Sequence, residues 1–193
     1  SNKICKILGK NPPNGFAYEL FLDEKGEKIS KSKGNGISIE QWLRYASPES
    51  LALYMYPNPK RAKKLYSDVV PKTVDEYLSH IEKYPAQEIK EKILNPVWHV
   101  HNGKPPKEKI IMSFSMLLNL VGSSNADNKN ILWKFINRFH KEIKPENFKI
   151  LNNLTEYAIN YFKDKVEPNK KFKKPSSNEK KALEHLILRL SEI

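Results

Sequence analysis

Apolar residues recur every three or four positions through most of this chain after residue 60, the spacing that places them on one face of a helix. These stripes and apolar stretches lie at residues 74–81, 110–121, 131–139 and 148–162. Pro85 closes the first of them, since a proline disfavours helix at the preceding residue. Residues 95–103 lack the pattern and are interpreted as a connector. Several apolar faces of this kind predict a packed helical bundle.

The pattern predicts one more helix at the end of the chain. Its start is Ser176, which forms a capping box with Glu179 three residues later. We expect this helix to bury Leu183, Leu186, Ile187 and Leu190. Because no stop signal follows, we also expect that the chain ends inside a larger helical domain.

The first quarter of the chain has a different pattern. Residues 16–22 are aromatic and aliphatic almost without interruption, which predicts a strand covered on both faces. Residues 23–26 follow as a turn, in which Gly26 can take a positive φ. A run rich in lysine and serine then leaves the edge of the predicted sheet.

Two short helices are expected after this run. Ser38 and Gln41 form a capping box for the first of them. Ser47 suits the N-cap of the second, Pro48 suits its first helical position, and Pro57 stops it. These helices would anchor the far end of the lysine- and serine-rich run.

Charge and cysteine content narrow the class of protein. Lysine and arginine total 34 against 22 acidic residues, a formal net charge of +12 over 193 residues. Such an excess favours a polyanionic partner such as RNA, DNA or a membrane surface. The lone Cys5 excludes an internal disulfide and suits a reducing cytoplasm. No apolar run approaches the roughly 20 residues of a membrane span, so we expect a soluble protein of the cytoplasm without a membrane partner.

Residues 28–35 carry the strongest chemical signal, with the sequence Lys-Ile-Ser-Lys-Ser-Lys-Gly-Asn. Alternating lysines and serines supply ammonium charges and small hydroxyl donors on a backbone that can move, which suits a triphosphate. Cations placed in advance accelerate attack on an α-phosphate if they bind the charge that grows on the departing pyrophosphate. Composition alone leaves a second interpretation open, a solvated turn rich in lysine and serine.

Two basic segments are candidates for RNA contact. The first comprises Lys60, Arg61, Lys63 and Lys64. The second spans residues 163–174, where acidic residues and Pro168 leave a solvated linker as an open alternative. Contacts from either segment would go to phosphates and carry little sequence information.

The histidines His99 and His101 would point to the same side if the backbone were extended, and could then share a metal ion. No third ligand is evident by spacing. The pair is therefore interpreted as part of the connector, and no metal site is expected.

The motif at residues 28–32 resembles the second signature of class I aminoacyl-tRNA synthetases, with Ile29 in place of the usual methionine. The Lys-Gly-Asn extension that often follows it is also present. The surrounding segments at 11–13, 18–22, 38–43 and 54–62 look like the class I form of lysyl-tRNA synthetase.

This resemblance implies a two-step reaction. Lysine and ATP give lysyl-adenylate and pyrophosphate, and the lysyl group then passes to the terminal ribose of tRNA(Lys). Position by position, Lys28 and Lys31 would be the catalytic cations, and Ile29, Ser30 and Ser32 would complete the ATP-binding loop. Mg²⁺ would accompany ATP, and the basic segment at 60–64 stands where the family contacts the acceptor stem.

The resemblance also implies a domain organisation. The expected fold is mainly α. Residues 1–70 would be the end of a class I nucleotide-binding fold, a short α/β remnant with its stem-contact region, and residues 71–193 a helical tRNA (anticodon)-binding region.

The other family signature, a His-Ile-Gly-His-type element, does not occur in this sequence. We therefore expect that the chain alone neither forms adenylate nor charges tRNA. Two alternatives stay open from the residues: a basic helical RNA-binding module without catalysis, and a class I synthetase for methionine, cysteine or arginine.

Overall fold

The computed structural model describes residues 2–30, 32–171 and 173–191. Ten α-helices in these residues are α1 (Asn2–Ile7), α2 (Ile39–Tyr45), α3 (Pro48–Met55), α4 (Val69–Lys83), α5 (Ile89–Leu94), α6 (Pro96–Val100), α7 (Phe114–Ser124), α8 (Lys129–Phe139), α9 (Lys149–Tyr161) and α10 (Ser177–Ser191). Two strands are β1 (Phe21–Leu22) and β2 (Lys63–Lys64). Short 3₁₀ turns lie at Tyr84–Ala86 and Glu167–Asn169, and a π-helical turn at Phe162–Val166.

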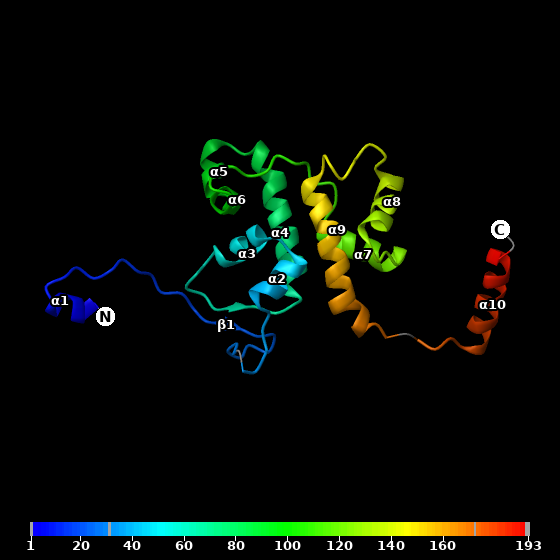
Figure 1. The fold of residues 1–193 in the computed structure, drawn as a ribbon, viewed down its shortest axis with the longest axis horizontal. Coiled ribbons are helices and arrows are strands. Elements are labelled where there is room, and N and C mark those ends of the chain that lie inside the picture. The colour runs from blue at the N-terminus through cyan, green and yellow to red at the C-terminus, as the bar shows by residue number, and fades with distance from the viewer. Residues whose placement is uncertain (1, 31, 172, 192–193) are drawn as a thin grey trace.

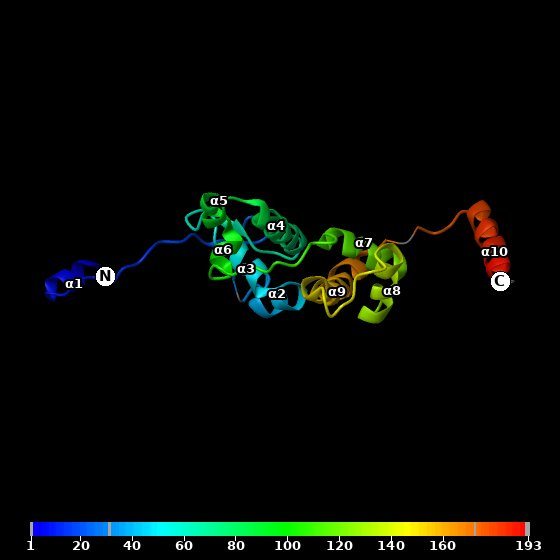
Figure 2. The ribbon, with the colours of Figure 1, turned by 90° about the horizontal axis from the view of Figure 1, so that it is seen from above.

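The helices α2 to α9 form a central body, and α1 and α10 lie apart from it at opposite ends (Figures 1 and 2). The mainly helical fold that the sequence predicts is confirmed. None of the described helices is both long enough and apolar enough to cross a membrane.

The small sheet joins two distant segments of the chain. β1 and β2 run parallel, with Phe21 opposite Lys63 and Leu22 opposite Lys64. The backbone N–H of Leu65 donates to the Leu22 carbonyl at 2.7 Å, and its carbonyl accepts from the Ile37 N–H at 3.3 Å. Leu65 therefore holds both ends of the lysine- and serine-rich run.

The two helices predicted after this run are confirmed, together with their caps. Gln41 N–H donates to the Ser38 hydroxyl at 3.2 Å and the Gln41 side chain accepts from the Ser38 N–H at 3.0 Å, the complete capping box. Ser47 caps α3, with Pro48 as its first residue. The buried Trp42 donates from Nε1 to the Ser50 hydroxyl at 3.2 Å, which fixes α2 against α3.

The central body has one apolar core, supplied by the stripes that the sequence predicts. α9 packs against α2, α7 and α8, and α4 packs against α3 and α7. Fully buried side chains in this core include Trp42, Val74, Ile81, Phe114, Leu117, Leu132, Ile136 and Ala158. The stripe at 131–139 is only partly buried, because Phe139 at the end of α8 is 77% exposed.

Polar contacts join α2 to the turn that follows α9. Arg44 Nε donates to Asp164 Oδ2 at 2.6 Å, and the Tyr45 hydroxyl donates to the same oxygen at 3.0 Å. The hydrogen bond from Arg44 is the largest cause that holds the pKa of Asp164 below its ordinary value.

The strand predicted at residues 16–22 is wrong for most of its length. Only Phe21 and Leu22 are in a strand, and Phe16 and Tyr18 are 75% and 72% exposed. The described part of the chain contains no second layer that covers these rings. The apolar run at 16–20 therefore marks an apolar surface, but the run itself does not show which element covers that surface.

Two further predictions need correction. The connector at 95–103 contains the helix α6, which begins after Asn95, since the Asn95 side chain accepts from the Val97 N–H at 3.1 Å. α10 begins with the predicted capping box of Ser176 and Glu179. Its expected burial is wrong: Leu183, Leu186, Ile187 and Leu190 are 50–62% exposed. Helical spacing predicts an apolar face, but no described element lies against this one.

Candidate functional site

The lysine- and serine-rich run stands on a hairpin, which we call the signature hairpin (residues 21–37). At its turn, the Asp23 N–H donates to the Glu27 carbonyl at 2.8 Å, and the Asp23 carbonyl accepts from the Gly26 N–H at 3.1 Å. Gly26 makes the turn at φ +86°, as predicted. The Ile29 N–H then donates to the Phe21 carbonyl at 3.1 Å. Lys28 and Ile29 therefore leave the sheet from an ordered base.

The side chain of Asn35 closes this base from the other end. Its amide Nδ2 donates to Asp23 Oδ2 at 2.7 Å and to the Lys28 carbonyl at 3.3 Å. Its Oδ1 accepts from the Ser30 N–H at 3.0 Å. One side chain therefore joins the strand end, the first lysine and the first serine of the motif.

Asp23 is buried at the centre of this arrangement, only 6% exposed. Burial alone would raise the pKa of its carboxyl, but hydrogen bonds from the Glu27 N–H and the Asn35 amide outweigh that effect, so the pKa lies below its ordinary value. The carboxylate therefore stays ionised and acts only as an acceptor. Sequence reasoning missed Asp23 and Asn35 as a pair, although an Asp at the end of a strand is a common turn former.

Close packing completes the base. A Cβ at Gly36 would lie 2.7 Å from the Ile29 side chain, so only glycine lets Ile29 cover this point of the backbone. Gly34 has φ +59°, in the left-handed region that glycine favours. Both glycines thus serve the geometry of the hairpin.

At the tip of the hairpin, the Ser30 carbonyl accepts from the N–H groups of Lys33 and Gly34 at 3.2 and 3.1 Å. Lys28 is exposed and has no ion pair with another described residue. The hydroxyls of Ser30 and Ser32 lie 2.9 Å apart, and Lys33 forms an exposed pair with Glu27 at 3.6 Å. The predicted catalytic residue Lys31 lies outside the described residues.

An open hollow of about 650 Å³ lies beside the tip, lined by Ile29, Ser30, Gly34, Gly36 and residues 37–41 at the start of α2. Residues of the motif thus form one wall of this space. The hollow is open to solvent, and its lining includes the hydroxyl-bearing residues Ser30 and Ser38.

The four basic residues predicted to contact RNA divide into two pairs. Lys60 and Arg61 are exposed and have no hydrogen-bonding side-chain partner among the described residues. Lys63 instead donates to the carbonyls of Tyr54 and Met55 at 2.6 and 3.2 Å, at the end of α3, and burial lowers its pKa. Lys64 donates to the carbonyl of Glu24 at 2.8 Å. In this structure the Lys63 side chain therefore holds the end of α3, and the Lys64 side chain holds the turn of the hairpin.

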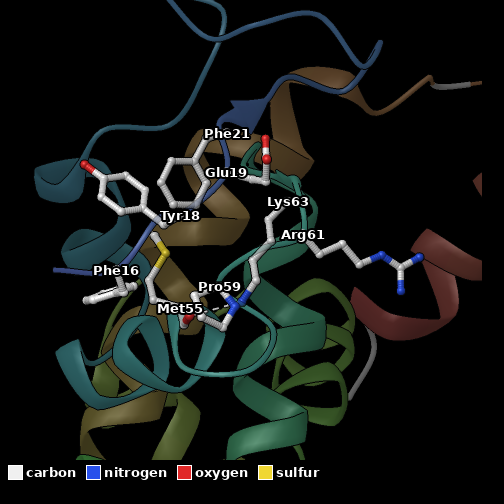
Figure 3. Close-up of a pocket in the computed structure, with 8 residues that line it drawn as sticks. All are labelled: Phe16, Tyr18, Glu19, Phe21, Met55, Pro59, Arg61 and Lys63. Atoms are coloured by element: carbon white, nitrogen blue, oxygen red, sulfur yellow. Dashed lines mark hydrogen bonds between the residues drawn. The ribbon is translucent and has the colours of Figure 1, made fainter. Parts of the chain in front are cut away.

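Two of these basic residues, Arg61 and Lys63, line a pocket of about 220 Å³ (Figure 3). Its lining comprises Phe16, Tyr18, Glu19, Phe21, Met55, Pro59, Arg61 and Lys63. Figure 3 shows the Lys63 ammonium directed at Met55, whereas the Arg61 guanidinium extends away from the pocket. The sequence did not indicate this pocket, because its pattern predicts that the aromatic residues form a covered strand.

The later basic segment is partly folded onto the central body. Lys163 donates to the Asp127 carbonyl at 3.0 Å, Asp164 pairs with Arg44, and the Lys165 ammonium lies 5.8 Å from the Tyr45 ring centre. Residues 170, 171, 173 and 174 have no regular structure, and Phe172 lies outside the described residues.

The two histidines do not meet. His99 Nε2 lies 2.7 Å from the Ile93 carbonyl, and His101 Nε2 lies 2.9 Å from the Tyr77 hydroxyl. The extended backbone on which a shared side depended is not present, because His99 lies in α6, and helical residues two apart point in different directions. Within the described ranges, no three side chains of His, Cys, Asp or Glu gather as metal ligands.

Comparison with known proteins assigns the class. The family profile described as tRNA synthetases class I (K) matches residues 1–104, which is more than half of the chain. The chain therefore belongs to the class I (K) tRNA synthetase family.

Relatives with curated names extend the likeness over nearly the whole chain. The lysine–tRNA ligase of Roseobacter denitrificans is 50% identical over 185 residues, covering 96% of this chain and 35% of the relative. The lysine–tRNA ligase of Rickettsia bellii is 48% identical, covering 96% of this chain and 36% of the relative. The lysine–tRNA ligase of Rickettsia rickettsii is 47% identical, covering 100% of this chain and 37% of the relative. The chain thus spans about a third of the length of these relatives, and no solved structure matches it.

Proposed function

We propose that this chain is the part of a lysine–tRNA ligase that carries the ATP signature loop, and that the full-length protein joins lysine to tRNA(Lys). The observation that carries the proposal is the signature sequence on an ordered hairpin, with Lys28 exposed and with Ile29 and Ser30 lining an open hollow. Family membership and the names of the three relatives support the same function.

In the first step, the lysine carboxylate attacks the α-phosphate of ATP, and pyrophosphate leaves with the electron pair of the broken P–O bond. Negative charge grows on the leaving group, and Lys28 and Lys31 would stabilise it. The hydroxyls of Ser30 and Ser32 would donate hydrogen bonds to the phosphates, and the backbone at Ile29 would complete the ATP-binding loop. Such interactions raise the rate only insofar as they are stronger in the transition state than with bound ATP.

Mg²⁺ belongs to this proposal as a companion of ATP. The described residues provide no cluster of three candidate metal ligands, so the phosphate oxygens would be the main ligands of the ion. The ion would neutralise part of the triphosphate charge while the lysines act on the pyrophosphate.

In the second step, the lysyl group passes to the terminal ribose of tRNA(Lys). Lys60 and Arg61 are exposed shortly before β2, and Leu65, which follows β2, holds both ends of the signature hairpin. A phosphate of the acceptor stem on these side chains would lie close to the loop. We assign residues 1–70 to the end of the catalytic domain and residues 71–193 to a helical tRNA (anticodon)-binding region.

The test is ATP–pyrophosphate exchange by the full-length protein that carries this chain, with lysine, methionine, cysteine or arginine supplied separately. Exchange with lysine alone is expected. Exchange with one of the other three and not with lysine would overturn the assignment of the amino acid. The chain of residues 1–193 on its own is expected to give no exchange, and a robust signal from it would contradict the division of the site that we propose.

A further inference from the structure

We infer that Asp23 and Asn35 are positioning residues for the signature loop, and that their hydrogen-bonded pair, the Asp23–Asn35 latch, sets where Lys28, the first lysine of the motif, stands. This inference rests on the proposed function of the loop. Neither residue lies within the five-residue motif, and neither would need to touch ATP.

The contacts of Asn35 explain why this one side chain matters. Its amide donates to Asp23 at 2.7 Å and to the Lys28 carbonyl at 3.3 Å, while its oxygen accepts from the Ser30 N–H at 3.0 Å. Two backbone groups on either side of Ile29 are thus bound to the same amide. The direction in which the chain leaves the sheet, and with it the placement of Lys28, follows from that amide.

The other half of the latch is fixed to the sheet. Asp23 follows β1, is only 6% exposed, and its Oδ1 accepts from the Glu27 N–H at 2.8 Å. Its Oδ2 accepts from Asn35. Since a carboxylate only accepts and an amide can donate, the latch has a defined polarity, and each residue depends on the chemical type of the other.

The contrast with the tip shows what the latch does. At the tip, the Ser30 carbonyl accepts from the N–H groups of Lys33 and Gly34. The side-chain contacts there, the Ser30–Ser32 hydroxyl pair and the Lys33–Glu27 ion pair, are exposed, and water competes with them. The base of the hairpin is therefore fixed by polar contacts around the buried Asp23, whereas the side-chain contacts of its tip are exposed. A displaced base would misplace Lys28 in the transition state, and a misplacement of about 1 Å can cost roughly 10²-fold in rate.

Exchange of the two side chains provides the sharpest test. In Asn35→Asp, two carboxylates face each other across the latch, so the hydrogen bond between them cannot form. In Asp23→Asn, residue 23 keeps one acceptor oxygen where the carboxylate has two. In the double variant Asp23→Asn/Asn35→Asp, the amide at position 23 can donate to the carboxylate at position 35, which still accepts from the Ser30 N–H. The hydrogen bond between positions 23 and 35 is thus restored with reversed polarity, whereas the Lys28 carbonyl loses the donor that Asn35 supplies.

The first measurement is lysine-dependent ATP–pyrophosphate exchange in the full-length protein. We expect kcat to fall roughly 10- to 100-fold in Asn35→Asp, with KM for ATP and lysine nearly unchanged, because placement is lost and ground-state binding is kept. The double variant should recover most of the missing kcat. Asn14→Asp, an exposed change of the same chemistry outside the hairpin, should behave like the unmodified protein.

The second measurement is hydrogen exchange at the Ser30 amide of this chain, which does not depend on activity. Exchange should be faster in Asn35→Asp and slow again in the double variant. If Asn35→Asp does not fold, Asp23→Asn is compared with the double variant, which should have the slower amide exchange and the higher kcat. If the double variant has neither a higher kcat nor a slower exchange of the Ser30 amide than the single variants, the latch is overturned.

The two proposals fail in different ways. An unmodified full-length protein without lysine-dependent exchange would remove the proposed function, whereas the Ser30 amide would still report whether the latch exists. A latch seen at Ser30, combined with unchanged kcat in all variants, would remove its role in positioning Lys28.

Discussion

The signature hairpin and the helical bundle of α4, α7, α8 and α9 lie in one body but are held by different forces. The bundle is held by apolar burial, with Phe114, Leu117 and Leu132 completely buried. The hairpin is held by directional hydrogen bonds around Asp23 and Asn35 and by the close contact of Ile29 with Gly36. A few directional hydrogen bonds of this kind fix the course of the backbone without a large apolar core. This suits a loop whose charged side chains face solvent.

Because of this difference, residues that stabilise the fold are distinct from residues that are proposed to act on the reaction. Leu117 has no access to a ligand, and its whole contribution is to packing. Lys28 is exposed, and no described residue forms an ion pair with it. Substitutions in the bundle should therefore change the free energy of unfolding, whereas substitutions at the tip of the hairpin should change the reaction alone.

The largest expected effect on stability is that of Leu117→Ala, in the centre of α7. The variant loses buried apolar area and leaves a cavity, which should lower the free energy of unfolding by about 2–5 kcal/mol. Urea unfolding of this chain measures it. Met116→Ala, on the 57% exposed neighbour, is the matched control and should change little. Equal losses in both variants would show that the core is not where the structure places it.

Sequence reasoning predicted what depends on neighbours in the chain. The caps at Ser38 and Ser47 follow from residues within four positions, and the buried faces of α4 and α9 follow from helical periodicity. The signature motif at 28–32 was likewise visible by itself.

Sequence reasoning could not predict contacts between residues far apart in the chain, or whether an apolar face is covered by another surface. The amide of Asn35 meets Asp23 across 12 positions, and Lys63 closes the end of α3 because β2 pairs with β1. The apolar faces of residues 16–20 and of α10 are real, but periodicity says nothing about whether a second surface covers them. Both kinds of miss concern tertiary contact.

Among the basic residues, Lys60 and Arg61 should matter for tRNA binding and Lys10 should not. Replacing Lys60 and Arg61 by alanine is expected to weaken tRNA(Lys) binding of the full-length protein about equally for any sequence. The log–log salt slope should fall by about one for each phosphate that is no longer neutralised. Filter binding at several salt concentrations measures both. Lys10→Ala, exposed shortly after α1, serves as the control. An unchanged slope would remove this segment from the RNA interface.

Asp164, which joins α2 to the turn after α9, should give the bundle a pH-dependent increment of stability. Its pKa is lowered in the fold, so its contribution is present above its unfolded pKa of about 3.9 and is lost as pH falls through the lower, folded value. Asp164→Asn should lower the free energy of unfolding by about 0.2–1 kcal/mol near neutral pH. Urea unfolding at a series of pH values should show the two proteins converging in acid; a constant difference would argue against the ion pair with Arg44.

The smallest effect is expected on α10. Leu186 is 51% exposed and no described helix covers it, so Leu186→Ser should change the free energy of unfolding of this chain by no more than about 0.5 kcal/mol. Leu154→Ala, on the buried face of α9, is the contrasting variant. A large loss from Leu186→Ser would mean that α10 packs on the bundle in solution.

The exposed lysines of the hairpin are proposed to act on the reaction and not on the fold, and Lys28→Ala tests this division. Lysine-dependent ATP–pyrophosphate exchange and urea unfolding are to be measured together in the full-length protein, with Lys25→Ala in the preceding turn as control. We predict that exchange falls about 10²–10³-fold in Lys28→Ala, by analogy with the loss of one oxyanion donor, while the unfolding midpoint stays the same. Exchange that persists in Lys28→Ala at the rate of Lys25→Ala would contradict this division.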